Sequence, residues 1–350
     1  MDKREIQGTW WFPQDATKRW IGRLSLPKAE SPRLNFIVPN DAGFAAPPYP
    51  SVLLGEDEHA QPVSLLRLGR ESLRETSTLS EVSYQAGHAF TGVHIHDTAD
   101  LLITTIDLYI QQLVGWVRRT GFEGSVIQST ADETTLHYRT PPDLRFNLRE
   151  GLSLELVTFP TNWDHGREQG IREDGYIYLD APAGIRFQET HNLINSLAQI
   201  LHFATLRPIY PIQVKGTSAP IRQDAKSKRF EWISGWMHDD VKSEIDPDRW
   251  VFQFPDVQND FGAFCSRWFH ASSTYQEALS SYFTTVHHPL PDSVQHLCLT
   301  QALEAYHGVK NAAHHNDFEL KIRELAQAHR RNLPGFFDSI IGVSQQILTD

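Results

Sequence analysis

Two histidines in the N-terminal half have a spacing that suits metal binding. His94 and His96 are two residues apart, and Asp97 follows directly. On a β-strand, alternate side chains point to the same face, so both imidazoles would lie side by side. With His88 or Asp97, the pair offers the ligand types that hold a divalent metal. No third ligand stands at a diagnostic spacing, and a polar strand face beside a turn has the same pattern. We therefore expect no metal and no other cofactor.

A second group of chemically capable residues is a basic cluster near the C-terminus. Between residues 310 and 331, five basic and three acidic side chains leave a charge of +2 in a chain of formal charge −11. The basic residues are Lys310, Lys321, Arg323, Arg330 and Arg331. This contrast favours a local contact with the phosphates of RNA. A solvated helix face would have the same composition, and the sequence leaves both interpretations open.

The sequence motifs of several common functional classes are absent from this chain. It contains no Gly-x-Ser-x-Gly elbow and no Gly-x-x-x-x-Gly-Lys loop, which argues against a serine hydrolase and an NTPase. The two cysteines, Cys265 and Cys298, are too few for a disulfide framework. No run approaches about 18 apolar residues, and the N-terminus has no apolar leader. We expect a soluble cytoplasmic protein without membrane contact.

The first two hundred residues have the pattern of an antiparallel β-rich domain, a sandwich or a barrel, interrupted by two helices. Short apolar runs alternate with turn residues. The spacing of apolar residues predicts a short helix over Gln111–Arg119 and a longer one from Glu189 to Ala204, capped within Thr190–Asn192. The predicted strands are Trp20–Leu26, Leu34–Val38, Val63–Leu68, Thr91–His96, Leu101–Tyr109, Thr134–Arg139, Leu144–Leu148, Leu152–Phe159 and Ile209–Lys215.

The C-terminal part is predicted to be entirely helical. From Phe261 onward no strand pattern is present, and Pro289 and Pro291 break the helical periodicity. Four antiparallel helices with short connections would make a compact bundle. The predicted helices are Phe261–Phe283, Asp292–Lys310, Phe318–Arg331 and Phe337–Leu348. The resulting domains are residues 1–215, a connecting segment over 216–260, and a helical domain over 261–350.

Short motifs along the chain resemble those of a known family. Near the start are GTWWFP at Gly8–Pro13, IGRL at Ile21–Leu24, VLLG at Val52–Gly55 and PVSL at Pro62–Leu65. They are followed by FTG at Phe90–Gly92, LVGW at Leu113–Trp116 and ATLRPIY at Ala204–Tyr210. This set is similar to the N-terminal domain of ApeA proteins, an abortive-infection family of anti-phage defence. The ALEAYH motif at Ala302–His307 resembles the helical HEPN domain attached to it.

The resemblance implies a metal-independent ribonuclease that acts as a homodimer. In such domains an Arg and a His stand a few residues apart after a helix, and the 2′-hydroxyl of RNA is the nucleophile. The His transfers protons, and the Arg binds the phosphorane oxygens. In this chain the only pair of similar spacing in the helical region is Arg323 and His329. Glu324 follows the Arg, and six helical residues place the two side chains about 120° apart.

The resemblance implies a function, but this chain departs from the catalytic motif of the family. No Arg or His follows Ile340, and we expect the chain to end before the motif and to be nearly silent in catalysis unless Arg323 and His329 act. The implied function is an anti-phage effector with an N-terminal sensing domain, an RNA substrate and a phage-encoded trigger. The alternative is a non-catalytic ligand- or RNA-binding regulatory module that dimerises through its helices.

Overall fold

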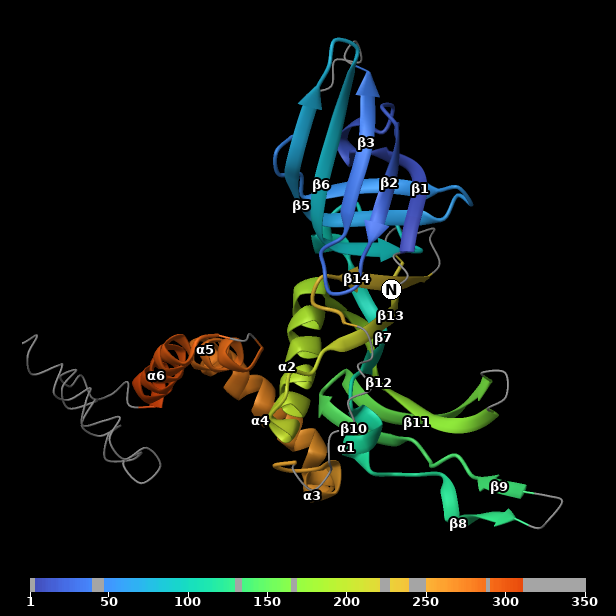
Figure 1. The fold of residues 1–350 in the computed structure, drawn as a ribbon, viewed down its shortest axis with the longest axis vertical. Coiled ribbons are helices and arrows are strands. Elements are labelled where there is room, and N and C mark those ends of the chain that lie inside the picture. The colour runs from blue at the N-terminus through green and yellow to red at the C-terminus, as the bar shows by residue number, and fades with distance from the viewer. Residues whose placement is uncertain are drawn as a thin grey trace, which may run out of the picture. The chain divides into compact units, whose positions relative to one another are not determined.

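A computed structural model describes residues 4–39, 47–129, 134–164, 169–220, 227–238, 250–287 and 290–310 (Figure 1). The chain divides into two compact units, Met1–Ser266 and Arg267–Asp350. The first unit holds every strand in the described ranges, and the second holds helices. An antiparallel β-rich part followed by a helical part is thus confirmed.

The first six strands close on themselves. They are β1 (Arg4–Trp11), β2 (Trp20–Leu26), β3 (Arg33–Pro39), β4 (Val52–Asp57), β5 (Pro62–Glu75) and β6 (Leu79–Thr91). Their hydrogen-bonded order is β6-β3-β2-β1-β4-β5, and β5 pairs back with β6. All of these pairs are antiparallel. We call this part the closed sheet.

Aromatic side chains fill the closed sheet. In β3 the buried and exposed residues alternate strictly, so Leu34, Phe36 and Val38 point inward. Phe36 stacks on Trp20 and on Tyr84, with ring centroids 5.6 Å and 6.0 Å away. Such contacts add to the free energy gained by burying large apolar surfaces. The core therefore follows directly from the period-2 pattern of the strands.

A second, open sheet continues from β6. Its order is β10-β11-β12-β7-β13-β14-β6. The strands are β7 (Leu102–Ile110), β10 (Leu144–Arg149), β11 (Leu152–Asp164), β12 (Gln169–Arg186), β13 (Pro211–Ser218) and β14 (Lys228–Ser234). A separate hairpin consists of β8 (Phe122–Ser129) and β9 (Thr134–Tyr138). Single 3-10 turns cover Pro13–Asp15, Thr98–Asp100 and Gln258–Asp260.

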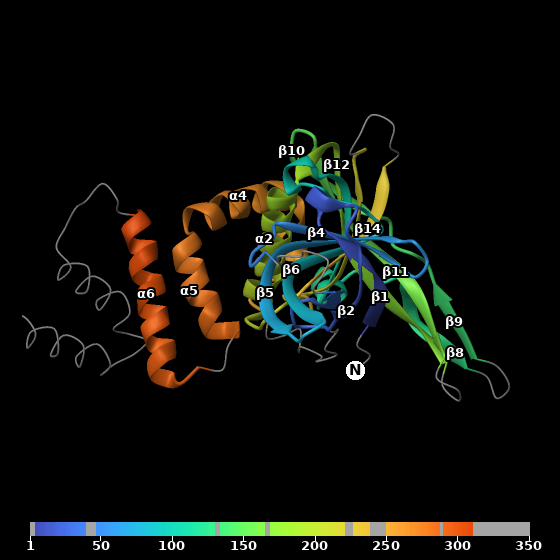
Figure 2. The same ribbon diagram turned by 90° about the horizontal axis from the view of Figure 1, so that it is seen from above.

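Helix α2 (Phe187–Thr205) covers one face of the open sheet (Figure 2). Its Phe187 contacts Trp232 of β14 with ring centroids 5.0 Å apart. Buried residues of the sheet that share this face include Ile106, Leu108 and Val214. Among the described residues of the first unit, no helix covers the other face of the open sheet.

An aromatic cluster anchors the first helices after the sheet. Trp116 of α1 (Leu113–Val117) lies 5.7 Å from Phe254 of α3 (Phe254–Val257). Phe146 of β10 lies 5.1 Å from Phe261, which begins α4 (Phe261–Thr274). At Gly262 a β-carbon would lie 2.6 Å from the carbonyl oxygen of Asn147, so the first turn of α4 requires a glycine there.

The second unit contains the end of α4, α5 (Gln276–His287) and α6 (Asp292–Lys310). Helices α5 and α6 pack against each other. Tyr275 lies 5.1 Å from Tyr306 between ring centroids. The predicted helix over Asp292–Lys310 is confirmed, whereas the predicted helix over Phe261–Phe283 is two helices that meet at Tyr275. The two later predicted helices lie outside the described residues.

The strand over Thr91–His96 was predicted wrongly. Strand β6 ends at Thr91, because Gly92 adopts a left-handed φ of 98° and turns the chain out of the sheet. The predicted cap of the long helix was also wrong, since α2 starts at Phe187 with Arg186 as its N-cap. Strands β1, β4, β6, β8, β12 and β14 were not among the predicted strands. The predicted connection over 216–260 contains β14, which pairs with β13 and β6.

Close packing at Trp10 gives a test of the closed sheet. Trp10 is fully buried and pairs with Gly55, where an added β-carbon would lie 2.3 Å from the Trp10 ring. We expect Gly55→Ala to lower the free energy of unfolding by about 1–3 kcal/mol through overpacking. Gly69→Ala is the matched control, because a β-carbon there meets nothing within 4 Å. Urea unfolding measures both, and equal effects at the two positions would contradict this packing.

Candidate functional site

The face of the open sheet away from α2 carries polar and aromatic side chains. Because side chains alternate along a strand, the neighbours of the buried residues point to this second face. On β7 these are Thr105, Asp107 and Tyr109, which alternate with buried isoleucine and leucine. The pattern continues on neighbouring strands with Glu155, Tyr176, Tyr178, Gln213, Lys215, Thr217, Arg229 and Glu231.

One row of this face runs straight across five strands. Glu155 pairs with Tyr178, Tyr178 with Asp107, Asp107 with Lys215, and Lys215 with Glu231. Directly paired residues of an antiparallel sheet have β-carbons about 4.5–5.5 Å apart, so neighbouring side chains interact. The row therefore places a lysine between two carboxylates and an aspartate beside a tyrosine.

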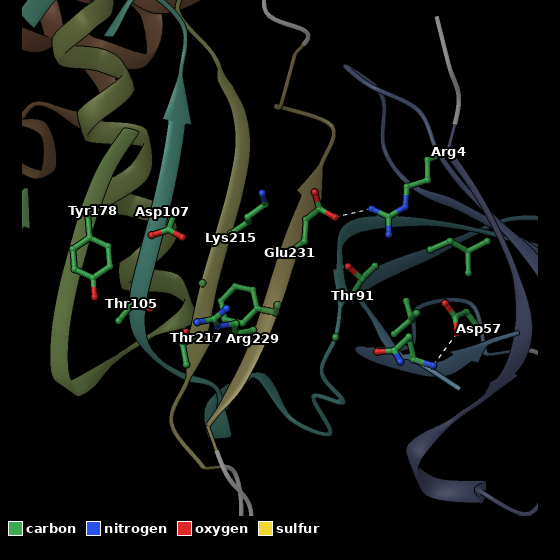
Figure 3. A pocket seen from close by; sticks show the side chains of 16 residues that line it. Arg4, Asp57, Thr91, Thr105, Asp107, Tyr178, Lys215, Thr217, Arg229 and Glu231 are labelled. Atoms are coloured by element: carbon green, nitrogen blue, oxygen red, sulfur yellow. Dashed lines mark hydrogen bonds and ion pairs between the residues drawn. The ribbon is translucent and has the colours of Figure 1, made fainter. Parts of the chain in front are cut away.

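A cleft of about 660 Å³ lies over this row, in the first unit (Figure 3). Its floor is formed by β7, β12, β13 and β14 of the open sheet. The closed sheet contributes the opposite wall through Arg4, Asp57, Gln61 and Thr91. Clefts of about 300–1,000 Å³ are typical of small-molecule sites. The size and the polar lining make this cleft the candidate site.

Glu231 is held in the cleft by two side chains. Arg4 Nη1 donates to Glu231 Oε2 at 2.6 Å, and Gln213 Nε2 donates to Glu231 Oε1 at 2.7 Å. Burial opposes ionisation of Glu231, but these hydrogen bonds and the charges of Arg4 and Lys215 outweigh it and lower its pKa. Glu231 is therefore ionised near pH 7, and the guanidinium of Arg4 largely balances its charge.

Asp107 lies in a different environment. Burial raises the pKa of its carboxyl group, and the nearby positive charges of Lys215 and Arg229 oppose this rise. In the described part of the chain, no hydrogen bond or ion pair is formed by its carboxylate. A half-buried carboxylate in a cleft is an acceptor suited to a hydroxyl or amino group of a ligand.

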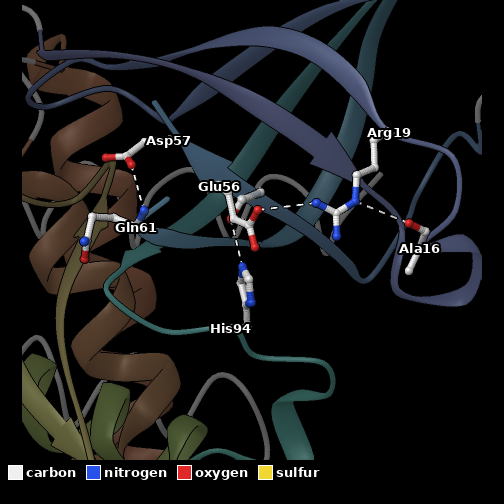
Figure 4. Close-up of polar contacts among 7 residues, drawn as sticks. Ala16, Arg19, Glu56, Asp57, Gln61 and His94 are labelled. Carbon is white, nitrogen blue, oxygen red and sulfur yellow. Dashed lines mark hydrogen bonds and ion pairs between the residues drawn. The ribbon is translucent and has the colours of Figure 1, made fainter. Parts of the chain in front are cut away.

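The two histidines singled out by the sequence lie apart from this row. His94 is bound to the closed sheet through its Nε2 atom, which is 2.9 Å from the carbonyl oxygen of Gly55 (Figure 4). Its ring also contacts the edge of Trp11. The ring centroids of His94 and His96 are 6.4 Å apart. Among the residues that the structure describes, no cluster of three His, Cys, Asp or Glu could hold a metal.

The candidate catalytic and RNA-binding residues fall at or beyond the end of the described chain. Lys310 is the last residue of α6. The other candidates, Arg323, His329, Lys321, Arg330 and Arg331, lie outside the described residues. Their roles stay predictions.

His88 is the histidine with the most altered environment. It lies on β6 and is 4% exposed. Trp232 Nε1 lies 3.3 Å and Ser234 Oγ 3.1 Å from its Nδ1 atom. Burial, together with the nearby His191 and Arg67, lowers the pKa of His88 to about 3. The ring is therefore neutral and structural near pH 7.

A comparison with known protein families identifies the family of the first unit. The family model of the ApeA N-terminal domain 1 matches residues 5–268. The chain belongs to this family. The match ends two residues after the boundary of the first compact unit at Ser266, so the ApeA domain and that unit coincide. Neither the curated proteins nor the solved structures gave a match to the chain.

The ApeA domain is followed by helices of modest hydrophobicity. Within the described ranges, none is both long and apolar enough to cross a membrane.

Sequence reasoning missed the cleft of the ApeA domain. The signal was present, because Thr105, Asp107 and Tyr109 alternate with apolar residues in a strand that was predicted. A second signal of the cleft came from β13. Lys215 is the last residue of the predicted strand over Ile209–Lys215, and Thr217 lies two residues beyond it. Arg229 and Glu231 lie on β14, which was not predicted, so the floor of the cleft was incomplete.

The buried neutral state of His88 predicts a pH dependence of stability. Its pKa is about 3 in the folded domain and 6.5 as the ordinary value, so only the unfolded chain gains the proton between these limits. The contribution of His88 to stability should be constant above about pH 6.5 and fall on acidification by about 1.4 kcal/mol per pH unit. Burial also lowers the pKa of the neighbouring His191, which adds to the loss in the same direction. Urea unfolding between pH 7 and pH 4 measures this slope.

The matched variants are His88→Gln and His59→Gln, since the His59 side chain is 77% exposed. His88→Gln should reduce this slope by about 1.4 kcal/mol per pH unit, although it lowers stability at pH 7. His59→Gln should leave the slope unchanged. An unchanged slope in His88→Gln would show that another group causes the acid sensitivity.

Proposed function

We propose that this protein is an anti-phage effector of the abortive-infection type, in which the ApeA domain senses infection and the helical unit degrades RNA. The observation that carries the proposal is the family match over residues 5–268, which spans nearly all of the first unit. The resemblance of the following segment to a HEPN domain supplies the ribonuclease part. Such a protein would act in the cytoplasm, where phage RNA and host RNA are both present.

The cleft of the ApeA domain supports a sensing role. It combines charged, hydroxyl and aromatic groups on a rigid sheet. These groups can bind the charged and polar parts of a ligand, which is what a sensing domain requires.

The ribonuclease part rests on Arg323 and His329. Two copies of this pair, brought together in a homodimer, would supply the phosphate-binding guanidinium and the proton-transferring imidazole. Lys310, Lys321, Arg330 and Arg331 would bind the RNA backbone. No metal is needed, because the 2′-hydroxyl of RNA attacks its own phosphodiester.

A second function is favoured by the spacing of that pair. If these residues form the helix that the sequence predicts, the six-residue spacing would place the two side chains about 120° apart, and they would not converge on one phosphate. In this alternative the protein is a non-catalytic ligand- or RNA-binding regulator that dimerises through its helices. The two functions differ in whether RNA is cut.

The test combines phage plating with RNA cleavage in the presence of a chelator. If the pair is catalytic, Arg323→Ala and His329→Ala should each reduce cleavage about 100-fold or more and abolish protection against phage. His315→Ala is the control, because it removes a neighbouring histidine outside the pair. Protection that persists in both variants without RNA cleavage would favour the regulator. A chain with neither protection nor cleavage would contradict the proposed effector.

A further inference from the structure

Two cations in the cleft have carboxylates nearby but, in the described part of the chain, form no ion pair within 4 Å. Lys215 and Arg229 are exposed and lie on the polar face of the open sheet. Within the described ranges, neither forms an ion pair with a carboxylate within 4 Å. By contrast, Arg4 of the same cleft is bound to Glu231. Lys215 and Arg229 are therefore available to an anion that enters the cleft.

The sheet register brings these two cations to the same place. Lys215 and Thr217 are successive residues of β13 on this face, and Arg229 pairs directly with Thr217. The diagonal from Lys215 to Arg229 on adjacent strands is about 7–8 Å, which long side chains span easily. Figure 3 shows the Arg229 guanidinium beside Thr217. Thr217 also pairs with Thr105, so two hydroxyl groups lie on the floor next to the cations.

Two cations beside hydroxyl groups suit a phosphate group. A guanidinium binds two phosphate oxygens at once, and an ammonium group adds a compact charge. The carboxylate of Glu231 does not oppose such an anion strongly, since Arg4 and Gln213 already bind it. Asp107 lies next to Lys215 with no partner in the described chain, so it can accept a hydrogen bond from the rest of the ligand.

We propose that the cleft of the ApeA domain binds a small phosphate monoester. Its phosphate lies against Lys215, Arg229 and Thr217, and a hydroxyl or amino group donates to Asp107. The volume of about 660 Å³ accommodates a sugar phosphate or a mononucleotide. Tyr178, directly paired with Asp107, offers a ring against which a sugar or base packs. This assignment does not depend on the anti-phage role or on RNA cleavage.

Calorimetric titration of the full chain tests the phosphate contact. The probes are inorganic phosphate, ribose 5-phosphate and ribose. Lys215→Gln and Arg229→Gln should each weaken binding of ribose 5-phosphate about 10- to 100-fold, the effect of losing one charge-assisted hydrogen bond. Lys228→Gln is the matched control, because Lys228 is exposed, adjacent in sequence and on the opposite face of β14. It should bind like the unaltered chain.

Asp107→Asn gives an effect in the opposite direction, which a folding defect would not produce. Removing its charge should strengthen binding of inorganic phosphate, because a like charge near the anion is lost. No binding of either phosphate probe up to about 10 mM would overturn the proposal. Equal affinity for ribose and ribose 5-phosphate would do the same. Tighter binding of a 5′-phosphorylated oligoribonucleotide, with the same dependence on Lys215, would replace the small ligand by RNA.

Discussion

Strand β6 is the element on which both sheets depend. Its first part, up to Gln85, pairs with β3, and its last part, from His88 to Thr91, pairs with β14 on the same side. Backbone groups buried in a sheet need partners throughout, so the change of neighbour must be bridged. Ala86 N donates to the carbonyl oxygen of Pro32 at 2.8 Å, which fills the gap between the two pairings. One continuous strand therefore fixes the closed sheet against the open sheet.

Side chains of β5, β14 and α2 meet at the place where β6 changes its partner. Opposite the change, Arg67 of β5 adopts a left-handed φ of 55° and directs its guanidinium to Gln188 of α2, at 2.5 Å. His88 lies between Trp232 and α2, and burial keeps it neutral. Because β14 is seated beside β6, its outward residues Arg229 and Glu231 face the closed sheet. Arg4 can then bind Glu231 across 227 positions of sequence, and the cleft results from this junction.

Local patterns were sufficient for part of this architecture and insufficient for the rest. The alternation in Trp20–Leu26 predicted β2 with its observed bounds, and the helical period over 292–310 predicted α6. Strand β6 escaped prediction because serine, glutamine, glycine and histidine interrupt the apolar residues of Leu79–Thr91. Its pairing on both sides, rather than its propensity, makes it a strand. For the same reason the cleft was missed, since a site built by β14 and β1 has no continuous motif.

The cleft and the helices that follow are joined by paired strands of the first unit. Tyr178 of β12 pairs with Glu155 of β11, which pairs with Arg145 of β10, and β10 packs against the first turn of α4 at Gly262. Since a β-carbon at Gly262 would overlap the carbonyl oxygen of Asn147, this contact tolerates little displacement between β10 and α4. Helix α4 starts at Phe261 in the ApeA domain and ends at Thr274 in the helical unit. A ligand that binds the cleft more tightly in one sheet geometry would shift the population of that geometry, and the start of α4 would move with β10. The paired strands of the sheet thus connect the cleft directly to the start of α4.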